Sequence, residues 1–134
     1  MVDAALVDAV PLFAALPADV RSELAEAFDE VTVPAGERIA SQGEFAYELF
    51  AVLEGTARIE QDGATVATVG PGDVIGEIGL MLTGRRTAAI VAESAVRLLA
   101  IFEQTFRQLC RQHPNLAEAV HAQSRGRFTR PAAH

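Results

Sequence analysis

The order of apolar and polar positions divides the chain into a helical start, a strand-rich middle and a helical end. Near the start, the stretch "LPADVRSELAEAF" has Pro17 in a first helical turn, and this predicts a helix over residues 17–28. Its apolar residues recur at helical spacing: Val20, Leu24, Ala27 and Phe28. The preceding "LVDAVPLF" predicts a shorter helical turn.

From Val31 onward, short segments that favour strands alternate with turn residues. The segments are "VTV", "ERIAS", "ELFAVLE", "TARIE" and "TVATV", and "TAAIVA" and "AVRLLAIF" follow later. Glycine, proline or Asp-Gly stands between most of them, as at Asp62-Gly63. Turn signals this regular predict about eight strands in an antiparallel sandwich or barrel.

Helical spacing returns after the last strand, in "EQTFRQLCRQ" and then in "PNLAEAVHAQSRGRF". The second segment has one apolar stripe: Leu116, Ala119, Val120 and Gln123. Because this stripe is short and rich in alanine, it favours packing of the helix onto its own barrel over formation of a homodimer. The whole chain of 134 residues is long enough for one domain with a real core.

Composition and charge exclude several classes of partner. The chain is 50% hydrophobic with a net charge of −7, and a nucleic-acid binder needs a basic surface. No stretch approaches the ~20 apolar residues of a membrane span. Asp3 and Asp8 occupy the part where a signal peptide is basic or apolar. We therefore expect a cytoplasmic protein that binds neither nucleic acid nor membrane.

The placement of cysteine and histidine argues against a metal site and against catalysis. Cys110 is the only cysteine, which excludes an internal disulfide, and we expect an inert, partly buried thiol. His113, His121 and His134 all follow the last predicted strand, where we expect solvated or capping side chains. A barrel without histidine lacks the ligands of a cupin-type metal enzyme and the base of a nucleophilic enzyme. We predict no metal and no enzymatic activity.

The stretch "GDVIGEIGLMLTGRRTAAIV" places charged residues among apolar ones. Residues 76–79 can form one helical turn whose free N–H groups bind an anion. Of Arg85 and Arg86, only one can point inward, because consecutive strand side chains face opposite sides. A buried guanidinium suits a phosphate, and an ionised Glu77 suits a hydroxyl group. These residues thus fit a compact anion with hydroxyl groups, although a pair between Glu77 and Arg86, or a surface position for both, remains equally open.

Within that stretch, "GEIGLMLTGRRTAA" resembles the phosphate-binding cassette of cyclic nucleotide-binding domains, which occur in catabolite-activator-type regulators, kinases and gated channels. The resemblance continues through "PAGERIASQGE", "LFAVLEGTARI" and "FRQLCRQHPNL", from about Leu16 to Arg127. It implies a mainly β fold, an eight-stranded antiparallel β-roll with an N-terminal helix, a short cassette helix and two C-terminal helices. The expected divisions are a helical segment 1–30, a β-roll 31–102 with its cassette at 75–89, C-terminal helices 103–128 and an unstructured tail 129–134.

The same resemblance implies a ligand site and a role for each residue in it. Glu77 would accept a hydrogen bond from the ribose 2′-hydroxyl, and Arg86 would bind the cyclic phosphate. Arg85, where many members have proline, would face solvent. The implied site comprises Gly76, Glu77, Ile78 and Gly79 beside phosphate and ribose, Arg86, Thr87 and Ala88 at the phosphate, and Ile59, Val66 and Ala67 as apolar contacts of ribose and base.

For function, the resemblance implies a sensor whose C-terminal helices close over the base and pass the signal to an effector. The residue that covers the base stays open among Arg125, Arg127 and Phe128. "IGEIGL" favours cAMP, and cGMP stays open because a hydroxyl such as that of Thr87 occurs with both ligands. The alternative is a structural or protein-interaction domain that has kept the fold and lost nucleotide binding. We expect either a regulatory piece of a larger protein or a sensor that acts through a partner.

Overall fold

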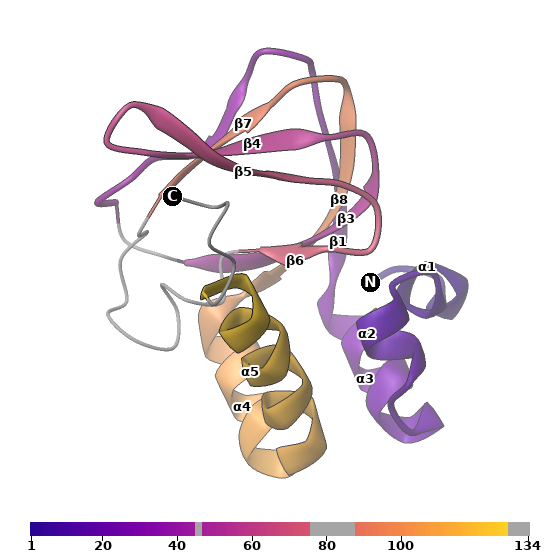
Figure 1. The fold of residues 1–134 in the computed structure, drawn as a ribbon. Coiled ribbons are helices and arrows are strands. Elements are labelled where there is room, and N and C mark those ends of the chain that lie inside the picture. The colour runs from indigo at the N-terminus through magenta and orange to yellow at the C-terminus, as the bar shows by residue number, and fades with distance from the viewer. Residues whose placement is uncertain (45–46, 76–87, 129–134) are drawn as a thin grey trace.

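The computed structural model describes residues 1–44, 47–75 and 88–128, with side chains in the last helix described as far as residue 122. Two layers of strands lie on one side of the molecule and the helices on the other (Figure 1). The N-terminal helices and the C-terminal pair lie next to the same sheet and share one core with it. None of the described helices is long and apolar enough to cross a membrane.

The N-terminal segment contains three short helices: α1 (Ala4–Asp8), α2 (Pro11–Ala14) and α3 (Ala18–Ala27). Asp3 caps α1, because its side chain accepts a hydrogen bond from the Ala5 N–H at 2.9 Å. The sequence predicted one helix preceded by a helical turn. The expected helical turn is instead two short helices, α1 and α2, divided at Val10. Val10 is extended because the ring of Pro11 disfavours helical geometry in the residue before it.

Within the described residues, eight strands form two antiparallel sheets of four, which confirms the predicted eight-stranded fold class. The first sheet has the order β1-β8-β3-β6 and the second the order β2-β7-β4-β5. The predicted cassette helix lies outside the described residues. The strands are β1 (Asp29–Val33), β2 (Arg38–Ala40), β3 (Glu48–Glu54), β4 (Ala57–Gln61), β5 (Ala64–Val69), β6 (Val74–Ile75), β7 (Ala89–Ala92) and β8 (Val96–Phe102).

The β4–β5 hairpin turns at Asp62 and Gly63, which both have positive φ, 53° and 82°. This is the geometry that an Asp-Gly pair favours in a two-residue hairpin. Gln42 fixes the turn from outside the hairpin: its Nε2 donates to Asp62 Oδ1 at 3.0 Å, and its Oε1 accepts from the Asp62 N–H at 2.9 Å. The loop after β2 is thereby tied to the tip of the hairpin.

The first sheet is buried on both faces and therefore contributes to two cores. Along β8, Leu99 and Ile101 face the helices, whereas Leu98 and Ala100 face the second sheet, as strand alternation requires. The helix-side core comprises Val7, Val10, Phe13, Leu16, Val20, Leu24, Ala25, Phe28, Leu49, Ala51, Val74, Leu99, Ile101, Phe106, Leu109, Leu116 and Val120. The inter-sheet core comprises Val33, Phe50, Val52, Ala57, Val69, Ile75, Ile90, Ala92, Val96, Leu98 and Ala100.

The two C-terminal helices, α4 (Glu103–Gln112) and α5 (Pro114–Phe128), pack onto the first sheet. Leu116 and Val120 of the predicted α5 stripe are fully buried in the helix-side core. Ala119 is half-buried against the same core, and Gln123 lies outside the described side chains. The described part of the stripe therefore packs within its own domain.

Candidate functional site

The predicted cassette is flanked by strands of different sheets. Ile75 ends β6 in the first sheet, and Ala89 begins β7 in the second. Both flanks are buried. Most of the predicted site residues fall between these flanks and lie outside the described residues, so their roles remain predictions: Gly76, Glu77, Ile78, Gly79, Arg86 and Thr87. Arg85, which we expected to face solvent, also lies outside the described residues.

Ile59 lies at the centre of the described part of the site. It is opposite Ala67 of β5 on one side and opposite Ile90 of β7 on the other. Residues directly opposite each other in antiparallel strands point to the same face of the sheet. Because Ile90 belongs to the inter-sheet core, Ile59 and Ala67 also face the interior of the roll, where both are half-buried.

A β-bulge brings Val66 into the same region. The register shifts between Ile59, which pairs with Ala67, and Glu60, which pairs with Thr65, so Val66 is the extra residue on β5. Val66 and Ala67 are consecutive and both half-buried, whereas an uninterrupted strand would expose one of them. The three predicted apolar contacts thus lie together on the β4–β5 hairpin.

Ala88, the fourth described site residue, is half-buried directly before β7. The next residue, Ala89, pairs with Glu60, one position along β4 from Ile59. Ala88 therefore lies at the same end of the second sheet as the hairpin contacts. It is also the last residue before β7 on the cassette side.

The charged side chains of β4 lie on the outer face of the second sheet. Arg58 Nε donates to Glu60 Oε2 at 3.2 Å, and both residues alternate with the inward Ile59. The residues that this sheet contributes to the inter-sheet core, among them Ala57, Ile90 and the adjoining Ile59, are apolar. A phosphate bound at the inner face of the second sheet would therefore need charged side chains or backbone N–H groups from other residues.

The structure shows one contact that sequence reasoning missed. We expected a solvated or capping side chain for His113, which is the C-cap residue of α4 and donates to Leu109 O through its backbone N–H. However, its half-buried imidazole also contacts the carboxylate of Glu23 on α3. The two residues are 90 positions apart, and no sequence pattern links them. The pair joins α3 to the junction between α4 and α5, next to a shallow groove lined by Glu26, Thr105, Gln108 and Gln112.

Neither cysteine nor acidic residues assemble a metal site in the part of the chain that the structure describes, where no three His, Cys, Asp or Glu side chains cluster. Cys110 is half-buried against the helix-side core. Burial raises the pKa of its thiol to about 11, because the charged thiolate loses its hydration there. The predicted inert thiol agrees with this environment.

Comparison with known families decides the classification. A family model described as the cyclic nucleotide-binding domain matches residues 30–113, from the first strand to the junction of α4 and α5. The chain belongs to this family. The match includes both described flanks of the cassette and the β4–β5 hairpin, so the cyclic nucleotide-binding domain accounts for the two sheets and for α4.

Relatives of this cyclic nucleotide-binding domain occur in larger proteins. The chain is 36% identical over 113 residues to a cyclic nucleotide-gated potassium channel of Mesorhizobium japonicum, covering 84% of the chain and 31% of the channel. It is 31% identical over 117 residues to the cyclic AMP receptor protein of Thermus thermophilus, covering 84% of the chain and 54% of the receptor. The chain thus spans about a third of the one and about half of the other.

A solved structure gives the same fold at lower identity. The regulatory subunit of a cAMP-independent protein kinase A from Trypanosoma brucei superposes with a TM-score of 0.84 at 20% identity, covering 96% of the chain and 45% of the subunit. At this identity the likeness concerns the fold alone. A cyclic nucleotide-binding domain fold by itself therefore does not decide which ligand is bound.

Proposed function

We propose that this domain is a sensor that binds a cyclic nucleotide in its β-roll. The observation that carries the proposal is the family match over residues 30–113, which contains "GEIGLMLTGRRTAA". The described flanks of this stretch support it, because they end in the two different sheets beside the inward-facing Ile59 and Ala67. A ligand held by the stretch would then have an apolar surface next to it.

In this proposal, polar and apolar groups divide the recognition of the ligand. The N–H groups of residues 76–79 and the guanidinium of Arg86 bind the cyclic phosphate, with Thr87 and Ala88 beside it. Glu77 accepts a hydrogen bond from a ribose hydroxyl. The bulged hairpin residues, Ile59, Val66 and Ala67, contact ribose and base through apolar surface.

We propose cAMP as the preferred ligand, with cGMP as the competitor. The preference rests on the resemblance of "IGEIGL" to bacterial cAMP-binding members. The hydroxyl of Thr87 is compatible with either base. Direct comparison of the two nucleotides therefore forms part of the test.

We also propose that α4 and α5 transmit binding to an effector domain or a partner protein. α4 begins directly after β8, and Leu116 and Val120 of α5 share one core with the N-terminal helices. A shift of α5 would therefore change the packing of α1–α3 in that shared core. Arg125, Arg127 and Phe128 are the proposed candidates for covering the base.

Thermal unfolding with and without nucleotide tests the sensor proposal. A ligand that binds only the folded state adds about 2.7 kcal/mol of stability at 100 times its dissociation constant. We expect a clear rise in Tm with cAMP or cGMP and little change with 5′-AMP, whose open phosphate carries more charge. If none of the three raises the Tm at millimolar concentration, the domain is not a nucleotide sensor.

The arginine pair supplies a matched control. Arg86→Leu should leave the fold intact and remove most of the nucleotide-induced shift, because it removes the cation proposed for the phosphate. Arg85→Leu removes an adjacent, outward cation and should matter far less. Equal effects of the two substitutions would show that the inward arginine is wrongly assigned.

The alternative function is a domain that has kept this fold for protein interaction and lost the nucleotide. The subunit from Trypanosoma brucei favours keeping this alternative, since a protein named cAMP-independent has the same fold. The two functions differ in the thermal assay. The alternative predicts a folded protein whose Tm no cyclic nucleotide changes.

A further inference from the structure

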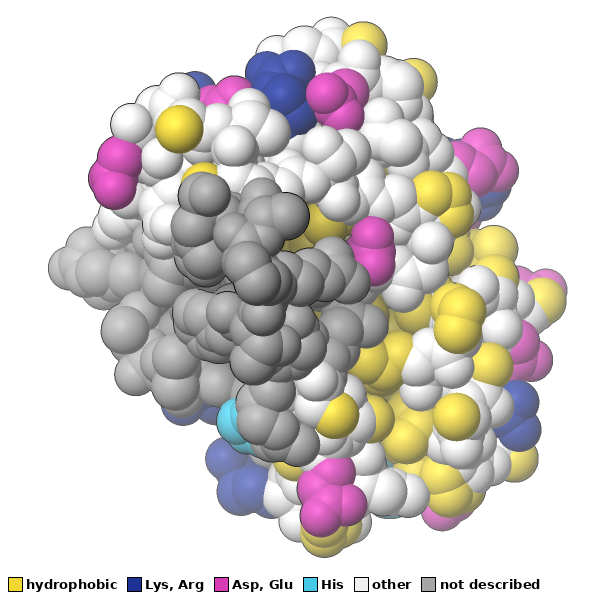
Figure 2. All heavy atoms as spheres, viewed as in Figure 1, with side chains coloured by type: hydrophobic (Ala, Val, Ile, Leu, Met, Phe, Trp, Pro, Cys, Tyr) yellow, Lys and Arg dark blue, Asp and Glu magenta, His cyan; other side chains and the backbone are white. Residues whose placement is uncertain are grey.

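The β4–β5 hairpin forms one edge of the second sheet, and its own charged pair does not tie it to the rest of the roll. In the order β2-β7-β4-β5, β5 and β2 are the two edge strands. Arg58 and Glu60 both belong to β4, and β5 has the uncharged sequence "ATVATV". Figure 2 shows a mostly white surface over this sheet, with scattered dark blue and magenta side chains. Contacts at the tip of the hairpin therefore affect its position relative to the other strands.

A row of residues crosses the second sheet at the level of the proposed apolar contacts. Ala40 of β2 is opposite Ile90 of β7. Ile90 is opposite Ile59 of β4, which is opposite Ala67 of β5 on its other side. Ala40 and Ile59 pack against the inter-sheet core that contains Ile90, so the row faces the interior of the roll. The row therefore gives the position of β2 relative to the proposed contacts on the hairpin.

Gln42 lies at the end of the second sheet at which the predicted cassette joins β7. From Ala40 the chain continues to Gln42, and the antiparallel β7 runs backward from Ile90 to Ala88 in the same direction. β4 continues from the same row to the hairpin tip at Asp62. Gln42, Ala88 and Asp62 thus lie at one end of the sheet, and β7 lies between the strands that lead to the other two.

Both polar groups of the Gln42 side chain bind Asp62. The amide Nε2 donates to Asp62 Oδ1 at 3.0 Å, and Oε1 accepts from the Asp62 N–H at 2.9 Å. The loop after β2 and the hairpin tip lie side by side in Figure 1. We call this pair the Gln42–Asp62 clamp. Because β7 separates β2 from β4 in the sheet, the clamp joins two elements that strand pairing does not join directly.

We propose that Gln42 is a positioning residue for the nucleotide, because the clamp holds the β4–β5 hairpin in place beside Ala88. The inference rests on the proposed function, in which the cassette binds the phosphate and the hairpin contacts ribose and base. A ligand bound at both places needs a constant separation between them. The bulge at Val66 bends β5 and increases its twist, so strand pairing alone fixes the hairpin less well. A clamp that sets the hairpin before the ligand arrives increases affinity, because less ordering remains to be done on binding.

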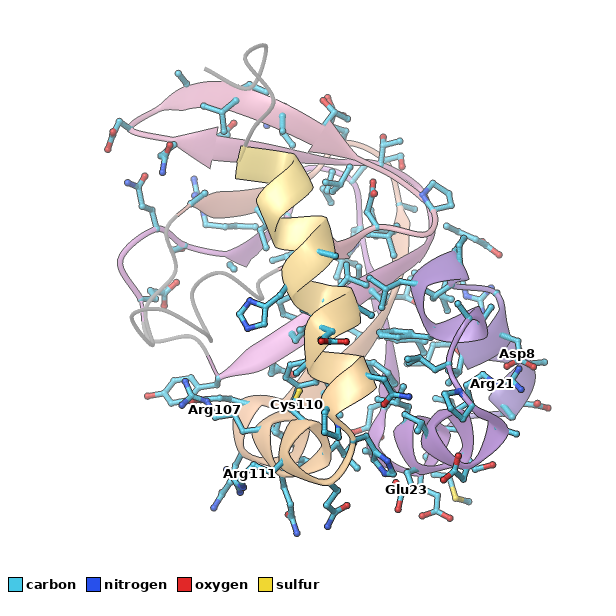
Figure 3. The ribbon with its side chains drawn as sticks, turned by 60° about the horizontal axis from the view of Figure 1, so that its bottom comes forward. Asp8, Arg21, Glu23, Arg107, Cys110 and Arg111 are labelled. Carbon is cyan, nitrogen blue, oxygen red and sulfur yellow. The ribbon has the colours of Figure 1, made fainter. Side chains whose placement is uncertain are left out.

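The test measures the Kd of the whole chain for cAMP and for cGMP by titration calorimetry. Gln42→Ala should weaken binding about fivefold, the loss expected from hydrogen bonds of ordinary strength. The Tm without nucleotide should fall by no more than about 4 °C, because both hydrogen bonds are exposed to water. Gln104→Ala is the matched control and should change the Kd less than about twofold. Gln104 is an exposed glutamine on α4, the helix that carries the labelled Arg107 and Arg111 on the side away from the hairpin (Figure 3).

A reversed pair separates positioning from a general loss of stability. Gln42→Glu removes the donor and places a second carboxylate beside Asp62, so it should weaken binding at least as much as Gln42→Ala. Adding Asp62→Asn restores both hydrogen bonds with the side-chain donor and acceptor exchanged and the net charge unchanged. Asparagine also tolerates the positive φ at this position. The double variant should recover a Kd within about twofold of the unsubstituted chain.

The outcomes distinguish this inference from the proposed function. If the unsubstituted chain binds neither nucleotide, both are overturned. If it binds but Gln42→Ala leaves the Kd unchanged, the positioning role alone is wrong and the sensor function stands. An equal loss in Gln104→Ala, or no recovery in the double variant, would likewise overturn the positioning role alone.

Discussion

The helix-side core and the inter-sheet core share the first sheet but differ in the elements that cover it: helices on one face and the second sheet on the other. In the part of the chain that the structure describes, strands alone supply the inter-sheet core, from Val33 to Ala100. The helix-side core combines residues from both ends of the chain, from Val7 to Val120, against the other face of β3, β6 and β8. Its formation therefore requires the N-terminal and C-terminal helices to be present together.

The two cores also differ in the size of their side chains. Of the ten largest fully buried side chains among the described residues, only Ile75 and Leu98 belong to the inter-sheet core. The helix-side core holds the others, including Phe13 and Phe28, whose rings are 5.6 Å apart in a tilted pair. Apolar stabilisation is thus concentrated where the helices attach, and smaller residues line the roll in which we propose the ligand binds.

Leu98 and Leu99 give the most direct test of whether the two cores are separate. They are adjacent, both fully buried, and face opposite cores. Leu98→Ala and Leu99→Ala should each lower the free energy of unfolding by about 2–5 kcal/mol, because each leaves a cavity. Denaturant unfolding measures the loss.

Hydrogen exchange then shows which part of the domain is destabilised in each variant. Leu99→Ala should speed exchange mainly in α3–α5, and Leu98→Ala mainly in β4, β5 and β7, because local opening follows the packing that was lost. The matched substitutions control for side-chain type. An identical exchange pattern in the two variants would mean that the domain opens as one unit.

The connection between the sheets can be tested at Gly55. This residue joins β3 of the first sheet to β4 of the second with φ of +87°, and an added Cβ would lie 2.2 Å from Ala95 O. Gly55→Ala should cost about 3 kcal/mol, from backbone strain and displacement of a main-chain oxygen. Gly63→Ala has a similar φ but open space around it, so it should cost only about 1 kcal/mol. Equal Tm values for the two variants would contradict this close approach.

Local sequence patterns predicted the regular elements well. β3 and α4 have the bounds that "ELFAVLE" and "EQTFRQLCRQ" indicated, because each segment has one dominant period and a clear turn or proline nearby. β6 was not distinguished, since the two residues Val74 and Ile75 are too few to show a period. Its pairing with β3 depends on a partner far along the chain.

The candidate site was less accessible to pattern analysis. Charge placement alone left a pair between Glu77 and Arg86 as open as a ligand site, and the family resemblance gave the preference. The bulge at Val66 could not be predicted, because it depends on a register shift within the hairpin that residue types do not mark. The contact between Glu23 and His113 could not be predicted either, because the two residues are 90 positions apart. Alternation would have placed Val66 and Ala67 on opposite faces.

The contact between Glu23 and His113 tests how tightly the two ends of the helix-side core are coupled. Glu23→Gln and His113→Gln should each lower the free energy of unfolding by up to about 1 kcal/mol, the range of partly exposed ion pairs. The double variant should lose less than the sum of the two, because the single changes remove the same interaction. Strictly additive losses would show that the pair does not couple α3 to the junction of α4 and α5.

The alkylation rate of Cys110 measures how well the helix-side core is closed, and it needs no stabilising or destabilising substitution. With its pKa raised to about 11 from 9.0, its thiolate fraction near pH 8 is about a hundredfold below that of the unfolded chain. Alkylation by iodoacetamide should therefore be about a hundredfold slower in the folded protein and should rise with pH until about 11.

Because the helix-side core buries this thiol, Leu99→Ala should speed its alkylation more than Leu98→Ala does. Mass spectrometry under native conditions measures both rates, with the denatured protein as the reference. Equal acceleration by the two substitutions would mean that α4 is released whenever either core is weakened, and the helices would then respond directly to changes inside the roll.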